Sequence, residues 1–177
     1  MRLHLAVFWL TAVSLGATGA RVSAQTPGEV QITVLRTERK PVVRYWATVA
    51  RTLPESLFTF RPVASVRTFA ELFAHVADAE FAMCAGLRSD APRPPSLEKA
   101  KLSPSELRRA LTESLEYCDT AYARVQDRAL SDTVDFFGTP SARLFVMAHD
   151  IAHLNEHYGN VVTYLRLLGL TPPSSQP

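Results

Sequence analysis

The chain has 177 residues, with 19 Lys and Arg, 17 Asp and Glu, five His and two Cys. This length is ample for a single hydrophobic core. The positive charges are dispersed among acids, which excludes the electrostatic footprint of a nucleic-acid-binding protein and a polybasic patch for anionic lipid. The sequence also lacks a Gly-rich phosphate loop, a Gly-x-Ser-x-Gly elbow and CxxC pairs. These absences argue against nucleotide, serine-hydrolase and zinc-ribbon chemistry.

Residues 1–24 have the pattern of a signal peptide. Arg2 precedes a short apolar run, and Val22-Ser23-Ala24 places small residues where signal peptidase requires them. Cleavage is therefore expected before Gln25, leaving 17 basic and 17 acidic side chains once Arg2 and Arg21 are removed. The alternative, an uncleaved membrane anchor, is disfavoured because the apolar run is short. We expect a bacterial protein that is exported, periplasmic or secreted, without stable membrane insertion after cleavage.

The remainder, residues 25–171, is expected to be one all-helical domain, followed by a short flexible tail at residues 172–177. Apolar residues recur at three- and four-residue spacing, and strict alternation never persists. A first helix is predicted from Glu29 to Thr52, with a kink or a break at Pro41. Its apolar positions are Val30, Val34, Val42, Tyr45, Trp46 and Val49.

The second helix has an explicit beginning. Thr68 and Glu71 form a capping-box pattern, in which each side chain accepts a hydrogen bond from the other residue's amide. The helix should run to about Leu87. Residues 89–99 are rich in proline and predict an extended connection, either a crossover or a surface loop.

Two further helices follow. Ser103, Pro104 and Glu106 predict a second capping box with proline at the first helical position. The apolar stripe of this helix is Leu107, Leu111, Leu115, Cys118, Tyr122 and Val125. The last helix is predicted to begin at Thr139-Pro140 and to end at Gly169. Its core face is Leu144, Met147, Ile151, Leu154, Tyr158, Val161, Leu165 and Leu168.

The histidines suggest a metal site. His153 and His157 are four residues apart on the last helix and therefore share one face, where His75 from the second helix can complete a three-nitrogen site. His149 lies farther round the helix and is left out. Spacing alone does not separate this site from a solvated His pair and an ordinary, partly buried His75.

Other polar residues near these histidines have candidate roles. Asp150 and Tyr164 lie in the same helical sector and are predicted to bond the second nitrogens of the imidazoles. Asp78 and Glu80 follow His75, and either could face a metal cavity as a proton acceptor or belong to a solvated charged face. Five arginines are interpreted as solvated surface: Arg61, Arg67, Arg88, Arg108 and Arg109.

The two cysteines, Cys84 and Cys118, fall on the second and third predicted helices. In an oxidising compartment they could form a disulfide. They could equally be two small buried hydrophobic residues, because free Cys is commonly buried. We assign them no catalytic role.

The chain resembles the DinB-like (damage-inducible) family, also called the DinB/YfiT-like metalloenzymes. The resemblance covers most of the chain after the signal peptide and runs through Phe58–Pro62, Leu72–Asp78, His153–Asn160 and Val162–Gly169. It implies a four-helix bundle in which one His of the second helix and a His pair of the last helix bind a divalent metal. By motif position these are His75, His153 and His157.

The sequence differs from the family in one motif, and the resemblance leads to two functional hypotheses. The family's common His-Arg-Gly-Gln ending is replaced by His157-Tyr158-Gly159-Asn160, so its hydrogen bonds around the metal are not carried over. The leading hypothesis is an exported metalloenzyme that holds Zn, Ni, Fe or Mn and catalyses hydrolysis or nucleophilic transfer, including thiol transfer as in some relatives. The alternative is a non-catalytic bundle that binds a metal or a small ligand. A small-molecule substrate is expected, and a homodimer is left open because no diagnostic stripe is seen.

Overall fold

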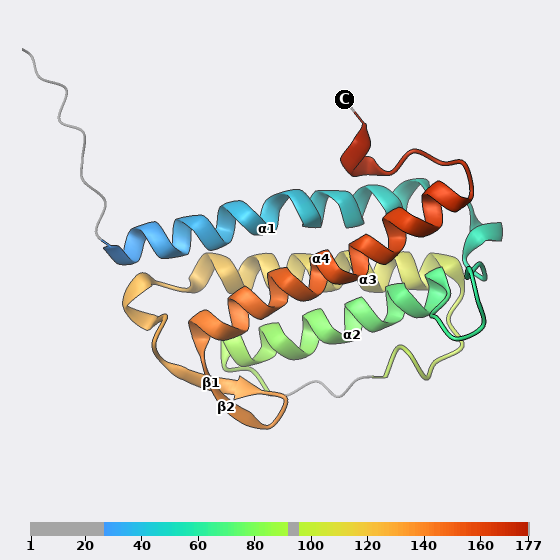
Figure 1. Cartoon of the computed structure of the whole chain (residues 1–177). Coiled ribbons are helices and arrows are strands. Elements are labelled where there is room, and N and C mark those ends of the chain that lie inside the picture. Colours follow the sequence, from blue (N-terminus) through green and yellow to red (C-terminus); the bar gives the residue numbers. More distant parts are fainter. Residues whose placement is uncertain (1–26, 92–95, 177) are drawn as a thin grey trace, which may run out of the picture.

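The computed structural model describes residues 27–91 and 96–176. The predicted signal peptide and its cleavage site lie outside these residues. Four long helices pack side by side as a bundle (Figure 1), which confirms the mostly helical fold. Their bounds are α1 Pro27–Thr52, α2 Phe69–Arg88, α3 Pro104–Arg124 and α4 Arg143–Leu167.

The predicted helix ends agree with local hydrogen bonding. Thr68 and Glu71 form a complete capping box before α2, and Ser103 and Glu106 form another before α3. Each box satisfies two amides that the first turn of a helix would otherwise leave unpaired. After α4, Gly169 adopts a φ of 73°, which glycine accepts without steric cost.

Helix α1 continues through Pro41, so the predicted break is wrong. Proline cannot donate to the carbonyl of Thr37, but both residues are exposed and water can hydrate that carbonyl. The buried face of α1 includes Val42, Trp46 and Val49. Of the predicted apolar positions, Val30 and Val34 are 43% and 51% exposed, so the core stripe does not extend to them.

A β-hairpin that the sequence analysis did not predict precedes α4. Strand β1 (Thr133–Phe136) pairs antiparallel with β2 (Thr139–Ala142) through the two-residue turn Phe137-Gly138. Both turn residues have positive φ, 51° and 82°, the geometry that joins twisted strands. The start predicted at Thr139-Pro140 is therefore wrong, and the domain is not entirely helical. Leu144, predicted in the core, lies in the first turn of α4 and is 37% exposed.

Three short 3₁₀ turns complete the described elements: η1 Glu55–Leu57, η2 Asp127–Ala129 and η3 Pro173–Ser175. The last falls in the stretch predicted to be a tail. There Pro172 is buried, and the Ser174 amide donates to the Tyr158 hydroxyl at 3.0 Å. Residues 172–176 thus fold back onto α4.

The buried apolar side chains of the bundle form two clusters, and a disulfide links two of the helices. The entire predicted stripe of α3 is buried, and Trp46 of α1 donates its indole N–H to the Leu154 carbonyl of α4 at 3.1 Å. Cys84 and Cys118 form a disulfide between α2 and α3, with their Cα atoms 5.2 Å apart. This settles the alternative left open by the sequence. No helix among the described residues is long and apolar enough to span a membrane.

A buried ionic cluster also crosses the core. Arg39 of α1 pairs with Glu80 of α2, Asp119 of α3 and Asp150 of α4. Arg39, Glu80 and Asp150 are almost wholly buried, and Tyr122 donates its hydroxyl to Asp150 at 2.8 Å. Arg39 therefore pairs with one acid from each of the other three helices, two of them inside the bundle and the third, Asp119, at its surface.

Candidate metal centre

Three imidazoles from two helices converge between α2 and α4. The Nε2 atom of His153 lies 3.2 Å from Nε2 of His75 and 3.1 Å from Nε2 of His157. All three ligand atoms lie within 4.8 Å of one another. The helical spacing of His153 and His157 places two rings on one face, and the packing of α2 on α4 brings the third. The structure thus brings together the three histidines that the sequence singled out.

Hydrogen bonding alone does not satisfy this arrangement. An imidazole nitrogen has one in-plane direction, used either by an N–H or by a lone pair. His153 Nε2 therefore cannot bond both neighbouring nitrogens well. The Nδ1 atom of His75 lies 3.1 Å from the Glu98 carboxylate, which favours a proton on Nδ1 and leaves Nε2 with its lone pair.

The electrostatic environment keeps the rings neutral. Burial lowers the pKa of His153 to about 4, and the neighbouring His157 and His75 add to the shift. Burial likewise lowers the pKa of His75, assisted by the charge of Arg67, and lowers the pKa of His157, assisted by His75. At neutral pH the three rings can therefore present lone pairs rather than protons.

The spacing of the nitrogens fits a single metal ion. Zinc binds imidazole at about 2.0–2.1 Å, which places two nitrogens of a tetrahedral site about 3.3 Å apart. The two Nε2 separations, 3.1 and 3.2 Å, are close to this value. His153 Nδ1 is buried without a hydrogen-bond partner among the described residues, so no protein group fixes the tautomer of this ring through Nδ1. A cation bound at Nε2 would fix it, with the proton on Nδ1. The three-histidine group could thus hold a metal.

Glu98 reaches the site from the connection before α3. Its Oε1 atom contacts both His75 Nδ1 and Arg67 Nε, each at 3.1 Å. The segment that carries it is tied down by Asp78, whose carboxylate accepts the amides of residues 96–98 at 2.9 to 3.1 Å. Residues 92–95 of the predicted extended connection lie outside the described residues. Asp78 is therefore a buried support for this loop and is not part of a solvated face.

The other residues predicted to bond the imidazoles or to face the metal cavity have different partners in the structure. Asp150 bonds Arg39 and Tyr122 in the core, and the Tyr164 hydroxyl donates to the Arg67 carbonyl at 2.9 Å, so neither bonds an imidazole. Glu80 also faces Arg39 inside the bundle and contributes neither to a metal cavity nor to a solvated face. The side-chain amide of Asn160 lies 3.4 Å from His157 Nδ1, a long contact.

Three of the five arginines expected at the surface, Arg67, Arg88 and Arg108, bond specific partners; Arg88 donates to the Asp90 carboxylate and to the Thr120 hydroxyl. Arg108 donates to the carbonyls of Ala50 and Leu53 at the end of α1 and lies over the Phe58 ring. Arg67 bonds Glu98 beside the histidines. Arginine suits such positions because its planar guanidinium can donate hydrogen bonds to several acceptors at once.

Hollows adjoin the histidines on two sides. One, of about 630 Å³, is largely polar and includes Arg61, Arg67 and His157 in its wall. The other, of about 250 Å³, is largely apolar and includes His153 and Phe137. Glu98 borders both. A ligand could therefore approach the group from a polar or an apolar side.

A second group with metal-ligand atoms consists of Cys84, Cys118 and Asp150. Both sulfurs belong to the disulfide, so neither offers the thiolate that binds metals. The histidine group is therefore the candidate metal centre of the described residues.

Sequence reasoning missed Glu98 and Arg39, and the reasons differ. Glu98 reaches His75 across the proline-rich connection, and no period in the sequence relates these positions. Arg39 falls between apolar positions of α1. A charged residue within a predicted core stripe is the sequence signal that could have identified it as a buried ionic residue.

Residues 42–161 match the model of the DinB superfamily, a span that contains all three histidines. No curated protein sequence matches the chain.

Solved structures share the fold. A DinB-like protein from Bacillus cereus is 17% identical with a TM-score of 0.68, covering 80% of this chain and 95% of that one. A DinB-like protein from Bacillus subtilis is 15% identical with a TM-score of 0.61, covering 78% and 93%. The mycothiol-dependent maleylpyruvate isomerase is 19% identical with a TM-score of 0.56, covering 75% of this chain and 59% of that chain. With a family match over more than half of its length, this chain belongs to the DinB superfamily.

Proposed function

We propose that this protein is an exported metalloenzyme that holds a divalent ion on His75, His153 and His157. The observation that carries the proposal is that Nε2 of His153 lies 3.2 Å from Nε2 of His75 and 3.1 Å from Nε2 of His157, with all three ligand atoms within 4.8 Å of one another. Zn, Ni, Fe and Mn are the candidate ions, because neutral imidazoles suit borderline divalent metals. When bound there, the ion would supply Lewis acidity that lowers the pKa of a water or thiol.

The surroundings of the histidines support an open, catalytic site over a closed storage site. Hollows on two sides leave room for a substrate beside the group. Arg61 and Arg67 can bind an anionic part of a substrate in the polar hollow, whereas Phe137 and Met83 can bind an apolar part on the other side. Hydrolysis and nucleophilic transfer are the reaction classes that this arrangement suits.

Thiol transfer is the specific reaction to test first. A relative of the same fold is a mycothiol-dependent isomerase, and its name alone motivates the assay. The non-catalytic alternative, a bundle that binds a metal or a small ligand, predicts tight metal binding with no turnover of any thiol or ester substrate.

Export has independent support in the described residues. The disulfide between Cys84 and Cys118 is of a kind that persists in oxidising compartments and is rare in the cytosol. It agrees with the signal-peptide pattern of residues 1–24. Amino-terminal sequencing of the exported protein should find Gln25 first, and recovery of an intact Met1 would contradict cleavage.

Metal content is the direct test of the site. The protein should be purified without chelators or a polyhistidine tag, beside His153→Ala and the control His149→Ala. His149 lies on the same helix but outside the three-nitrogen group. We expect near-stoichiometric metal by elemental analysis in the wild type and in His149→Ala, and loss of metal in His153→Ala.

Two outcomes would contradict the metal site. One is unchanged metal content in His153→Ala when circular dichroism shows that it remains folded. The other is a wild-type protein without metal even after incubation with Zn, Ni, Fe(II) and Mn salts.

A further inference from the structure

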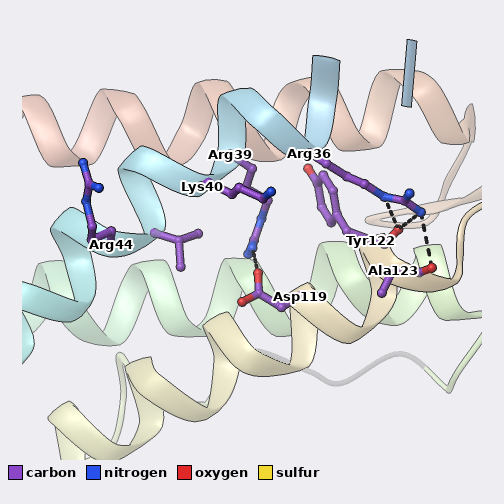
Figure 2. Close-up of a pocket in the computed structure, with 8 residues that line it drawn as sticks. Arg36, Arg39, Lys40, Arg44, Asp119, Tyr122 and Ala123 are labelled. Carbon is purple, nitrogen blue, oxygen red and sulfur yellow. Dashed lines mark hydrogen bonds and ion pairs between the residues drawn. The ribbon is translucent and has the colours of Figure 1, made fainter. Parts of the chain in front are cut away.

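A separate cavity lies between α1 and α3, whereas the three histidines lie on α2 and α4. Its volume is about 530 Å³, within the range of small-molecule pockets. Figure 2 shows basic side chains coming from α1, while Asp119 and Tyr122 come from α3. Nothing in the metal-centre chemistry uses these residues.

The cavity carries an excess of positive charge. Arg36, Lys40 and Arg44 follow one another at four-residue spacing on α1, so three cationic residues share one face of the helix. Asp119 is the only acid among the described residues that line the cavity, and it is paired with Arg39. Lys40 and Arg44 make no ion pair among the described residues, and both are exposed.

Arg36 is held in place at one end of the cavity. Its guanidinium donates to the carbonyls of Tyr122, Ala123 and Val125 at 2.9 to 3.3 Å. These carbonyls belong to the last turn of α3 and the residue after it, where helix carbonyls lack internal partners. Nη1 of Arg36 has no hydrogen-bond partner in the part of the chain that the structure describes, so it can still donate to a ligand.

The remaining lining is apolar. Val43, Ala123 and the ring of Tyr122 contribute to the wall, together with the methylene stems of the basic residues. Arg39 lies over the Tyr122 ring, 4.8 Å from its centroid, and is 2% exposed. Buried Arg39 and Tyr122 thus form the floor of the cavity, while the exposed Lys40 and Arg44 form a cationic rim.

We propose that this cavity binds a small amphipathic carboxylate, with its anionic group on Lys40 and Arg44 and its apolar body against Val43, Ala123 and the methylene stems of the basic side chains. An anion relieves the repulsion between neighbouring cations on α1. Its apolar body fills a wall that water would otherwise cover. A ligand without the charge or without the apolar body gains only part of this binding free energy.

Calorimetric titration of the full mature protein with octanoate tests the proposal, with octanol and acetate as comparison ligands. We expect one octanoate per chain, bound at least about tenfold tighter than octanol or acetate. Lys40→Gln/Arg44→Gln should weaken octanoate binding about tenfold or more. The control Lys101→Gln/Arg109→Gln, which removes two exposed cations elsewhere, should leave it unchanged.

A third variant should act in the opposite direction. Asp119→Asn removes the one negative charge of the wall and should tighten octanoate binding several-fold. Arg39 keeps Glu80 and Asp150 as partners in this variant, so the fold should persist.

Three results would overturn the proposal. Octanoate could bind no tighter than octanol, or its affinity could be the same in Lys40→Gln/Arg44→Gln and the control. The protein could also sediment with phosphatidylglycerol vesicles while showing no binding of monomeric octanoate, which would indicate a membrane surface as the ligand. Every variant should show the wild-type circular dichroism spectrum.

Discussion

Glu98 is the residue that fixes the orientation of His75. Its carboxylate accepts from Nδ1, which directs the Nε2 lone pair toward His153 and His157. Carboxylate partners of this kind set the tautomer of a metal-binding imidazole and increase its basicity.

Glu98→Gln is therefore expected to weaken metal binding about 10- to 100-fold without unfolding the protein. Competition with a chromogenic chelator measures this affinity. Glu116→Gln, the same change at an exposed position of α3, is the matched control. Equal affinities in the two variants would show that Glu98 does not support the site.

At the scale of single elements, the β-hairpin is packed closely on α2. A Cβ atom added to Gly86 would lie 2.1 Å from the backbone oxygen of Asp135 in β1. A backbone atom cannot move away unless the strand moves with it. Gly86 is therefore required by contact with the hairpin.

Gly86→Ala should reduce the free energy of unfolding by about 1–3 kcal/mol, as over-packing does in a tight interface. Gly159→Ala on α4 is the control, because nothing lies within 4 Å of its added Cβ. There alanine should stabilise the helix by up to about 1 kcal/mol. Urea denaturation measures both, and a stabilising effect of Gly86→Ala would contradict the observed packing.

The start of α2 has a pH dependence that follows from its capping box. Hydrogen bonds from Thr68 lower the pKa of Glu71 below its ordinary value of 4.5. A carboxylate with a lowered folded pKa adds stability above the unfolded pKa, and this stability is lost as pH falls through the folded pKa.

Glu71→Gln should therefore show a smaller loss of stability than the wild type between pH 7 and about pH 3. The difference should be below about 1 kcal/mol, because the pair is exposed. Urea denaturation across this range measures it, with Glu116→Gln as the control. An acid dependence identical to that of the wild type would contradict the role of the cap.

At the scale of the whole molecule, the Arg39 cluster joins all four helices. Arg39 meets Glu80, Asp119 and Asp150, one from each other helix. Burial and the nearby Asp150 raise the pKa of Glu80 well above its ordinary value, whereas the charge of Arg39 opposes that shift. The arginine therefore limits the cost of placing acids in the core.

Arg39→Met should destabilise the protein by about 3–5 kcal/mol, because it leaves buried carboxylates without their cation. Arg44→Met, an exposed position on the same helix, should change stability by less than about 0.5 kcal/mol. Adding Glu80→Gln and Asp150→Asn to Arg39→Met should restore part of the loss. Urea denaturation measures the free energy of unfolding of these variants. A value for Arg39→Met equal to that of the wild type would contradict this role of Arg39.

The sequence by itself determined the features that depend on neighbours in the chain. Both capping boxes join residues three apart, the stripe of α3 follows the helical period, and His153 and His157 share a face at four-residue spacing. These interactions form within one or two helical turns, so residue type and spacing are enough to predict them.

Only the tertiary structure determined the contacts that depend on packing between segments far apart in the sequence. Glu98 was placed beside His75, the disulfide was formed between α2 and α3, and Arg39 met Asp150 at a separation of 111 residues. The hairpin was missed because its strands are only four residues long, too short for a clear alternation. His75 lies 78 residues from His153, and only the packing of α2 against α4 places their nitrogens 3.2 Å apart. Helical period and capping act along one helix, whereas the geometry of this site depends on how two helices meet.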